Sequence, residues 1–383
     1  MKDAVAVIAL ALFAASAQLC ASRQAEGQDG LPVPLKIIFP DDAAGPVPVT
    51  VGVPLTAQPT SSDRLTVLTN SEPIPTQVRE VTRLGIEGQI TWLLVDFQAE
   101  PGATYSLDEV ASPSPSVSVT VTPGGEGGVT VDSGAGRWEV SATGNLLANV
   151  KNAGGQPLIT GAGWGSAAVP AEVEVLEQGP LRAMVRLRAR EAVSGLDLTA
   201  RLHFYAGLPY ARVRLTLTNH NRALTWAEAP DADNGECSWP EPSQPACNGL
   251  LSPNHIAVED VTWGLTLANP PSGSDEVLYQ DSSGTDRWNY YAEVRKEYQR
   301  LGLGPVHRMQ ADVTFRGVRH TRRGEVVNTG EAADGTLTAG GVRLDVPWFR
   351  ELFPKALRIR GSSLEFGVFP GEFSAVHRLR AGE

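Results

Sequence analysis

The sequence predicts an all-β protein with more than one domain, and three observations lead to this fold class. First, 39 glycines and 28 prolines divide the 383 residues into short apolar runs that are rich in valine, leucine and threonine. Second, several runs alternate apolar residues with arginine or threonine, as at 183–188 and 212–217, which gives a strand one buried and one solvated face. Third, helical periodicity longer than two turns is confined to one candidate, residues 290–301.

The composition is that of a globular chain and argues against a nucleic-acid partner. Hydrophobic residues make up 42% and charged residues 20%, which is enough apolar material for a buried core. The formal net charge is -11 without a block of lysine and arginine, whereas phosphate binding requires a clustered basic surface. A local group of arginines can still hold an acidic sugar. No cofactor is expected, and no segment after the N-terminus is apolar enough to span a bilayer.

Residues 1–17 have the pattern of a secretory signal peptide. Lys2 precedes an apolar run at 4–15, and the run ends in the small residues of a cleavage site, which we place between positions 17 and 28. The residues before Cys20 are a poor match to the context of lipid attachment, so no lipid anchor is expected. These features predict a secreted or periplasmic protein.

The remaining chain is expected to form two domains. Residues 31–111 contain short strands, opening at 35–39 and closing at 90–97, separated by proline and glycine turns. A serine and proline stretch at 112–116 forms the boundary. Residues 117–383 contain alternating strands at close spacing, which predicts a larger β-sandwich.

Two cysteines, Cys237 and Cys247, flank a proline-containing loop. In an oxidising compartment we expect them to form a disulfide, with two free thiols as the alternative. No metal site is expected, because no histidine or cysteine partner lies at ligand spacing.

Three groups of short phrases follow one another along the chain. The first group is 51–55, 75–79 and 92–97; the second is 177–183, 204–207, 279–284 and Trp288; the third is 347–357, 369–370 and 381–383. In this order they resemble the RIFT barrel, the central β-sandwich and the end of that sandwich in the exo-rhamnogalacturonan lyase family, family twenty-six of the polysaccharide lyases. Two departures from the family occur. Residues 84–89 replace a Trp-Pro-Asp-Gly-Ser-like turn, and the sequence stops at Glu383, where the family's α/α toroid begins.

The resemblance implies a small N-terminal RIFT-type barrel followed by a larger β-sandwich, acting on an acidic, plant-type pectic polysaccharide by β-elimination. It also implies that catalysis is incomplete in this chain and that a missing α/α toroid, encoded with it or as a separate polypeptide, supplies part of the site. A non-catalytic module that binds polysaccharide or has a structural role is the alternative. The third hypothesis is a β-only enzyme whose catalytic pocket is complete within these domains.

β-Elimination requires a cation at the uronate carboxylate, a base and an acid. Arg287 and His320 are the candidate catalytic residues, and Arg319 is a candidate for carboxylate binding. Hydrogen-bonding groups and an aromatic ring, which together suit sugar binding, occur in one segment: Gln280, Asp281, Ser282, Ser283 and Trp288. The alternatives are that this segment caps its own turn and that the basic stretch around His320 is solvated surface. His203, between apolar neighbours in an expected strand, is interpreted as structural.

Overall fold

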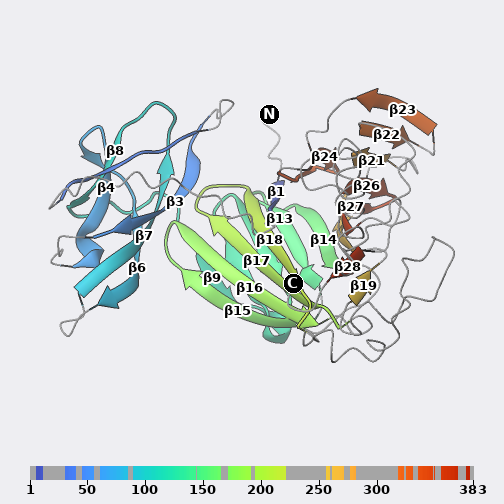
Figure 1. Cartoon of the computed structure of the whole chain (residues 1–383), viewed down its shortest axis with the longest axis horizontal. Helices are drawn as coiled ribbons and strands as arrows, with labels where there is room; N and C mark the ends of the chain where they lie inside the picture. Colours follow the sequence, from blue (N-terminus) through green and yellow to red (C-terminus); the bar gives the residue numbers. More distant parts are fainter. Residues whose placement is uncertain are drawn as a thin grey trace, which may run out of the picture.

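The computed structural model describes residues 6–11, 31–39, 45–55, 61–84, 89–143, 145–164, 171–190, 195–220, 256–258, 261–270, 277–281, 318–322, 325–330, 335–347, 349, 355–369 and 377–379. The regular elements of these residues are β-strands and the short 3-10 turns η1 (Ser62–Arg64) and η2 (Gly125–Gly127). The all-β class expected from the sequence is therefore confirmed (Figure 1). In the described ranges, no helix has the length and apolarity needed to cross a membrane.

An N-terminal unit is built from two antiparallel sheets, which lie at the left of Figure 1. One sheet consists, in spatial order, of β2 (Val33–Leu35), β8 (Tyr105–Glu109), β4 (Leu65–Thr69) and β5 (Glu72–Pro73). The other consists of β3 (Val47–Pro54), β7 (Gln89–Ala99) and β6 (Gln77–Leu84). Val67, Leu93 and Phe97 are among the buried side chains of its hydrophobic cluster. The RIFT-type closure that the family resemblance implies stays a prediction.

A larger, C-terminal unit contains a seven-stranded and a twelve-stranded sheet. The seven-stranded sheet has the order β15 (Ala171–Gln178), β16 (Arg182–Arg190), β17 (Asp197–Tyr205), β18 (Tyr210–Thr218), β1 (Ala6–Ala11), β25 (Val342–Asp345), β24 (Thr336–Ala339). The twelve-stranded sheet has the order β23 (Glu325–Gly330), β22 (Val318–Arg322), β21 (Val277–Asp281), β26 (Ala356–Arg360), β27 (Ser363–Phe369), β20 (Val261–Leu267), β14 (Pro157–Trp164), β13 (Asn149–Asn152), β11 (Gly136–Val140), β10 (Val129–Asp132), β9 (Thr120–Pro123), and β12 (Asn145–Leu147) pairs with β14. A separate pair is formed by β19 (Ile256–Val258) and β28 (His377–Leu379).

Strand β1 lies between β18 and β25 and is parallel to both. Its residues fall inside the segment whose composition predicts a signal peptide. Removal of that segment on export would take β1 out of the sheet. Export and cleavage stay predictions.

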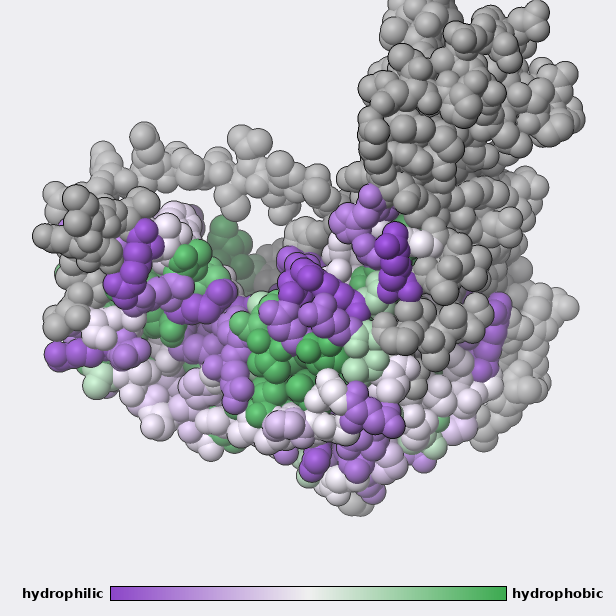
Figure 2. Space-filling view, turned by 90° about the horizontal axis from the view of Figure 1, so that it is seen from below, coloured by the Kyte–Doolittle hydropathy of each residue, from purple (hydrophilic) through white to green (hydrophobic). Residues whose placement is uncertain are grey.

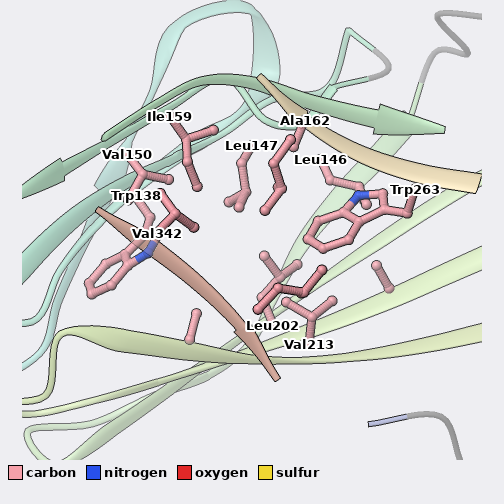
Figure 3. Close-up of a cluster of buried hydrophobic side chains, with 14 of the residues drawn as sticks. Trp138, Leu146, Leu147, Val150, Ile159, Ala162, Leu202, Val213, Trp263 and Val342 are labelled. Carbon is pink, nitrogen blue, oxygen red and sulfur yellow. The ribbon is translucent and has the colours of Figure 1, made fainter. Parts of the chain in front are cut away.

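One hydrophobic core lies between the two large sheets, which makes the unit sandwich-like (Figure 3). Trp138 and Trp263 enter it from the twelve-stranded sheet, and Leu202 and Val213 enter it from the seven-stranded sheet. The ring of Trp138 packs against that of Phe204, with 5.2 Å between the ring centroids. Large side chains from both layers thus fill the space that facing sheets leave between them.

The predicted alternation is confirmed in the strands of the seven-stranded sheet. In β17, Leu198, Ala200, Leu202 and Phe204 are buried, whereas the residues between them are partly exposed. The partly exposed positions include Arg201 and His203, so the polar residues that the pattern places on the solvated face do lie there. This outer face carries the candidate functional site.

Candidate functional site

Arginines gather on the outer face of three neighbouring strands, β16, β17 and β18. We call this group the arginine face, and its members are Arg186, Arg188, Arg201, Arg212 and Arg214. The strand register aligns three of them in one row, because Arg186 pairs with Arg201 and Arg201 pairs with Arg214. Side chains directly opposite in antiparallel strands have Cβ atoms about 4.5–5.5 Å apart, and like charges in that arrangement repel one another.

Among the described residues, a carboxylate pairs with the arginine face at its edge. Arg186 forms an ion pair with Glu174 of the neighbouring strand β15. Among the described residues, no carboxylate lies within ion-pair distance of Arg201 or Arg212. Burial, followed by the charges of Arg201 and Arg212, lowers the pKa of Arg214. The centre of the face is therefore positively charged although the whole chain has a formal net charge of -11.

At one end of the arginine face, a buried ion pair joins the two units. The Arg182 guanidinium, at the start of β16, donates from Nη1 to Asp96 Oδ1 of β7 at 2.9 Å and to Thr50 Oγ1 of β3 at 3.0 Å. The Thr50 hydroxyl donates to the same carboxylate oxygen. Both charged side chains are at least nine-tenths buried, with exposed fractions of 9% for Arg182 and 4% for Asp96. Removing one partner of such a pair strongly destabilises a protein, because the other partner is left as an uncompensated buried charge.

Gln77 of β6 forms the second connection between the units. Its amide nitrogen donates to Glu177 Oε1 at 2.9 Å, and its amide oxygen accepts from the backbone nitrogens of Leu181 and Arg182, each at 3.0 Å. The side chain thereby satisfies the backbone at the turn between β15 and β16. Four buried residues, Gln77, Asp96, Glu177 and Arg182, and their less buried partners Thr50 and His203 are called the Arg182 network from here on.

Two carboxylates in this network lie close to one guanidinium. Arg182 Nη1 is 3.7 Å from Glu177 Oε2, in addition to its contact with Asp96. Burial raises the pKa of Glu177, the charge of Arg182 opposes that rise, and Asp96 adds to it. The oxygens Asp96 Oδ2 and Glu177 Oε2 are both buried and have no hydrogen-bond partner among the described residues. A proton on Glu177 that is donated to Asp96 satisfies both oxygens, which agrees with the raised pKa.

His203 completes the network as a neutral acceptor. Its Nδ1 lies 2.9 Å from Arg182 Nη2, and a guanidinium can only donate in such a contact. Burial, followed by the charges of Arg182, Arg214, Arg212 and Arg201, lowers the pKa of His203 to about 3. The imidazole is therefore uncharged at neutral pH and holds the guanidinium in place. Its interpretation as a structural histidine agrees with these contacts.

Those residues predicted for the site from the sequence that the structure describes lie elsewhere, on the twelve-stranded sheet. Gln280 and Asp281 are in β21, and Arg319 and His320 are in β22. The strand register pairs Gln280 with Arg319, so these two predicted sugar-binding positions are neighbours across the sheet. The other predicted positions, Ser282, Ser283, Arg287, Trp288 and the two cysteines Cys237 and Cys247, lie outside the described residues, and their roles stay predictions.

In the described part of the chain, no group of three or more histidine, cysteine or acidic side chains is arranged to hold a metal ion. Sequence reasoning did not single out the Arg182 network. Its signal in the sequence was that three of the phrases with the family resemblance contain members of the network: Gln77 lies in 75–79, Asp96 in 92–97, and both Glu177 and Arg182 in 177–183.

No protein-family model matches this chain, and comparison with curated proteins gives no match. The similarity to the exo-rhamnogalacturonan lyase family therefore rests on the phrases of the sequence alone, and the activity that it implies is a proposal.

Proposed function

We propose that this protein is an exported, carbohydrate-active β protein of the polysaccharide lyase type that binds acidic pectic polysaccharide through the arginine face. The observation that carries the binding proposal is the row formed by Arg186, Arg201 and Arg214, with Arg212 beside it. The lyase component rests on the resemblance of the sequence to the rhamnogalacturonan lyase family.

The chemistry of the face fits uronic acids. A guanidinium pairs with a carboxylate through two parallel hydrogen bonds, and several guanidinium groups in a row offer such pairing to successive acidic sugars. Binding of carboxylates also relieves the repulsion among neighbouring arginines, so anion binding gains more here than at an isolated arginine. A rigid sheet holds the groups in place before the ligand arrives, which limits the entropy lost on binding.

A non-catalytic binding module is the competing function. The arginine face can bind an acidic polysaccharide whether or not the protein is an enzyme, because its guanidinium groups pair with carboxylates. The acid and base of β-elimination must come from other groups. The candidates for those roles, Arg287 and His320, remain predictions, as does the contribution of an α/α toroid. Turnover and binding therefore have to be measured separately.

The test is calorimetric titration of the purified protein with rhamnogalacturonan and polygalacturonate, with the absorbance of the unsaturated product followed in parallel. The double variant Arg201→Gln/Arg214→Gln is expected to lose affinity about 10–100-fold, since each charge-assisted contact contributes about 1.5–3 kcal/mol before losses to competing salt. Affinity of the wild type should also fall as salt is raised.

The matched control is Arg137→Gln, which removes an exposed arginine from β11 of the other large sheet. Equal affinity of the double variant and the wild type would refute the arginine face as the binding site. Binding without absorbance change supports the binding module or an enzyme that needs a further domain, whereas rising absorbance establishes a complete lyase.

A further inference from the structure

Trp92 is an exposed tryptophan on the outer face of the N-terminal unit, and 43% of its surface is accessible. It lies in β7, directly opposite Pro54 of β3 and Thr82 of β6. Large exposed hydrophobic residues are few among the described residues, and they are Ile38, Val81, Trp92, Val110, Val117 and Val175. Figure 2 shows hydrophobic side chains beside strongly hydrophilic ones on the face of the molecule seen from below.

The indole ring lies over the backbone of Gly52. A Cβ atom at Gly52 would be 3.0 Å from Trp92 Nε1 and 3.2 Å from Cζ2, which is closer than side chains normally approach. A side chain at position 52 would therefore push the indole ring outward by a few tenths of an ångström. One side of the indole ring contacts β3 at Gly52, and the other side faces solvent.

The ring has a cationic neighbour on the same face. Arg79 pairs with Leu94, which is two residues from Trp92 on β7 and so lies on the same side of the sheet. The Arg79 side chain is 44% exposed, and its Nη2 is 4.0 Å from Glu177 Oε2, the outer limit of an ion pair. The guanidinium can therefore pair with a ligand while it stays beside the Arg182 network.

The same strand leads from this surface to the junction of the two units. Asp96 of the Arg182 network is four residues beyond Trp92 on β7, which corresponds to about 13 Å at about 3.3 Å per residue. The junction that holds Arg182 also marks the start of the arginine face. A chain of a few sugar units is long enough to reach from Trp92 toward that junction.

We infer that Trp92, lying on Gly52 beside Arg79, is a stacking platform for a pyranose ring of an acidic oligosaccharide. An exposed indole offers the flat apolar surface on which the C–H face of a sugar packs, and Arg79 offers bidentate pairing to the uronate carboxylate. The acidic class of the ligand rests on the proposed function. The cationic neighbour favours this ligand over an apolar protein surface, because an apolar partner would have to desolvate the guanidinium.

The test compares four proteins by calorimetry: the wild type, Trp92→Ala, Gly52→Ala and the control Ile38→Ala, which removes exposed apolar surface elsewhere. The probes are defined oligosaccharides of alternating galacturonate and rhamnose, and neutral galactose oligosaccharides. We expect Trp92→Ala to weaken binding of the acidic oligosaccharide about tenfold. Gly52→Ala keeps the ring but displaces it, and should weaken binding about threefold. Ile38→Ala should match the wild type, and thermal denaturation checks that all four are folded.

The outcomes separate this inference from the proposed function. If Trp92→Ala binds the acidic oligosaccharide as tightly as the wild type while Arg201→Gln/Arg214→Gln does not, the platform is refuted and the proposed function stands. If the wild type binds only neutral oligosaccharides, and Trp92→Ala abolishes this, the platform stands and the acidic ligand is refuted. Absence of binding to both probes refutes both. Light scattering that shows a wild-type dimer and a monomeric Trp92→Ala variant would assign the ring to contact between copies of the chain and overturn the inference.

Discussion

Lys355 is a fully buried amine immediately before β26. Its Nζ donates to the backbone carbonyl of Val368 at 2.8 Å. Burial lowers its pKa to about 7, from the value of 10.5 expected in the unfolded chain. Between these two values the unfolded chain binds the proton more tightly than the folded chain, so the stability linked to Lys355 rises with pH through this window. This contribution to stability is complete above the pKa of Lys355 in the unfolded chain and is lost as the pH falls toward 7.

Replacement of this lysine with methionine should therefore stabilise the protein at neutral pH. Lys355→Met keeps the length of the side chain and removes the desolvated ammonium, and we expect a gain of about 1–3 kcal/mol in the free energy of unfolding. Denaturant unfolding at pH 7 and pH 9.5 measures the effect, which should be larger at pH 7. Lys36→Met, at an exposed position, is the control. If Lys355→Met lost stability and its stability depended on pH as that of the wild type does, burial of the ammonium would not be the cause of the lowered pKa.

At the scale of elements, strands β16 and β7 are held together by the contact of Arg182 with Asp96. The two residues are 86 positions apart in the sequence and come from different units. Gln98 of β7 adds a second link, because its amide nitrogen donates to the backbone carbonyl of Ala206 at 2.7 Å. Both contacts are directional and the contact between Arg182 and Asp96 is also buried, so they fix the relative position of the two strands more narrowly than apolar packing alone would.

Removal of the guanidinium should weaken this junction. Arg182→Met leaves Asp96 buried without its cation, and we expect a loss of about 3–5 kcal/mol. Differential scanning calorimetry is expected to show two separate transitions in the variant, because each unit keeps its own hydrophobic cluster. The double variant Arg182→Met/Asp96→Asn should recover part of the loss, since the uncompensated charge is gone. Equal stability of the single and double variants would argue against an ionised pair.

For the whole molecule, the place of β1 connects fold and export. The predicted cleavage between positions 17 and 28 would remove β1, after which β18 and β25 would face each other without the strand that pairs with both. We expect the exported protein to begin within that interval and to retain the sandwich-like core. Intact mass spectrometry of protein recovered outside the cytoplasm measures the N-terminus, and near-ultraviolet circular dichroism reports the core tryptophans. An exported chain that still carries residues 6–11 would make β1 a permanent strand and refute the signal-peptide interpretation.

Local patterns were enough to predict the class of the fold. Alternation in the segments at 183–188 and 212–217 predicted strands with one buried and one solvated face, and β16 and β18 have this arrangement. The reason is that side chains of a strand alternate between its two faces, so the exposure of each position follows from neighbours in the sequence. The same patterns could not show that three arginines form a row, because strand register depends on pairing between segments.

The all-β class and the outward position of the arginines on β16, β17 and β18 could be read from the sequence, since both follow from local composition and period. The contact of Arg182 with Asp96 and the place of Trp92 on Gly52 became known from the structure alone. Each of these contacts joins residues from different strands, and a residue's sequence position does not specify which strand will lie beside it. The junction of the units and the stacking platform therefore exist only once the sheets have formed, because packing and register bring distant residues within contact distance.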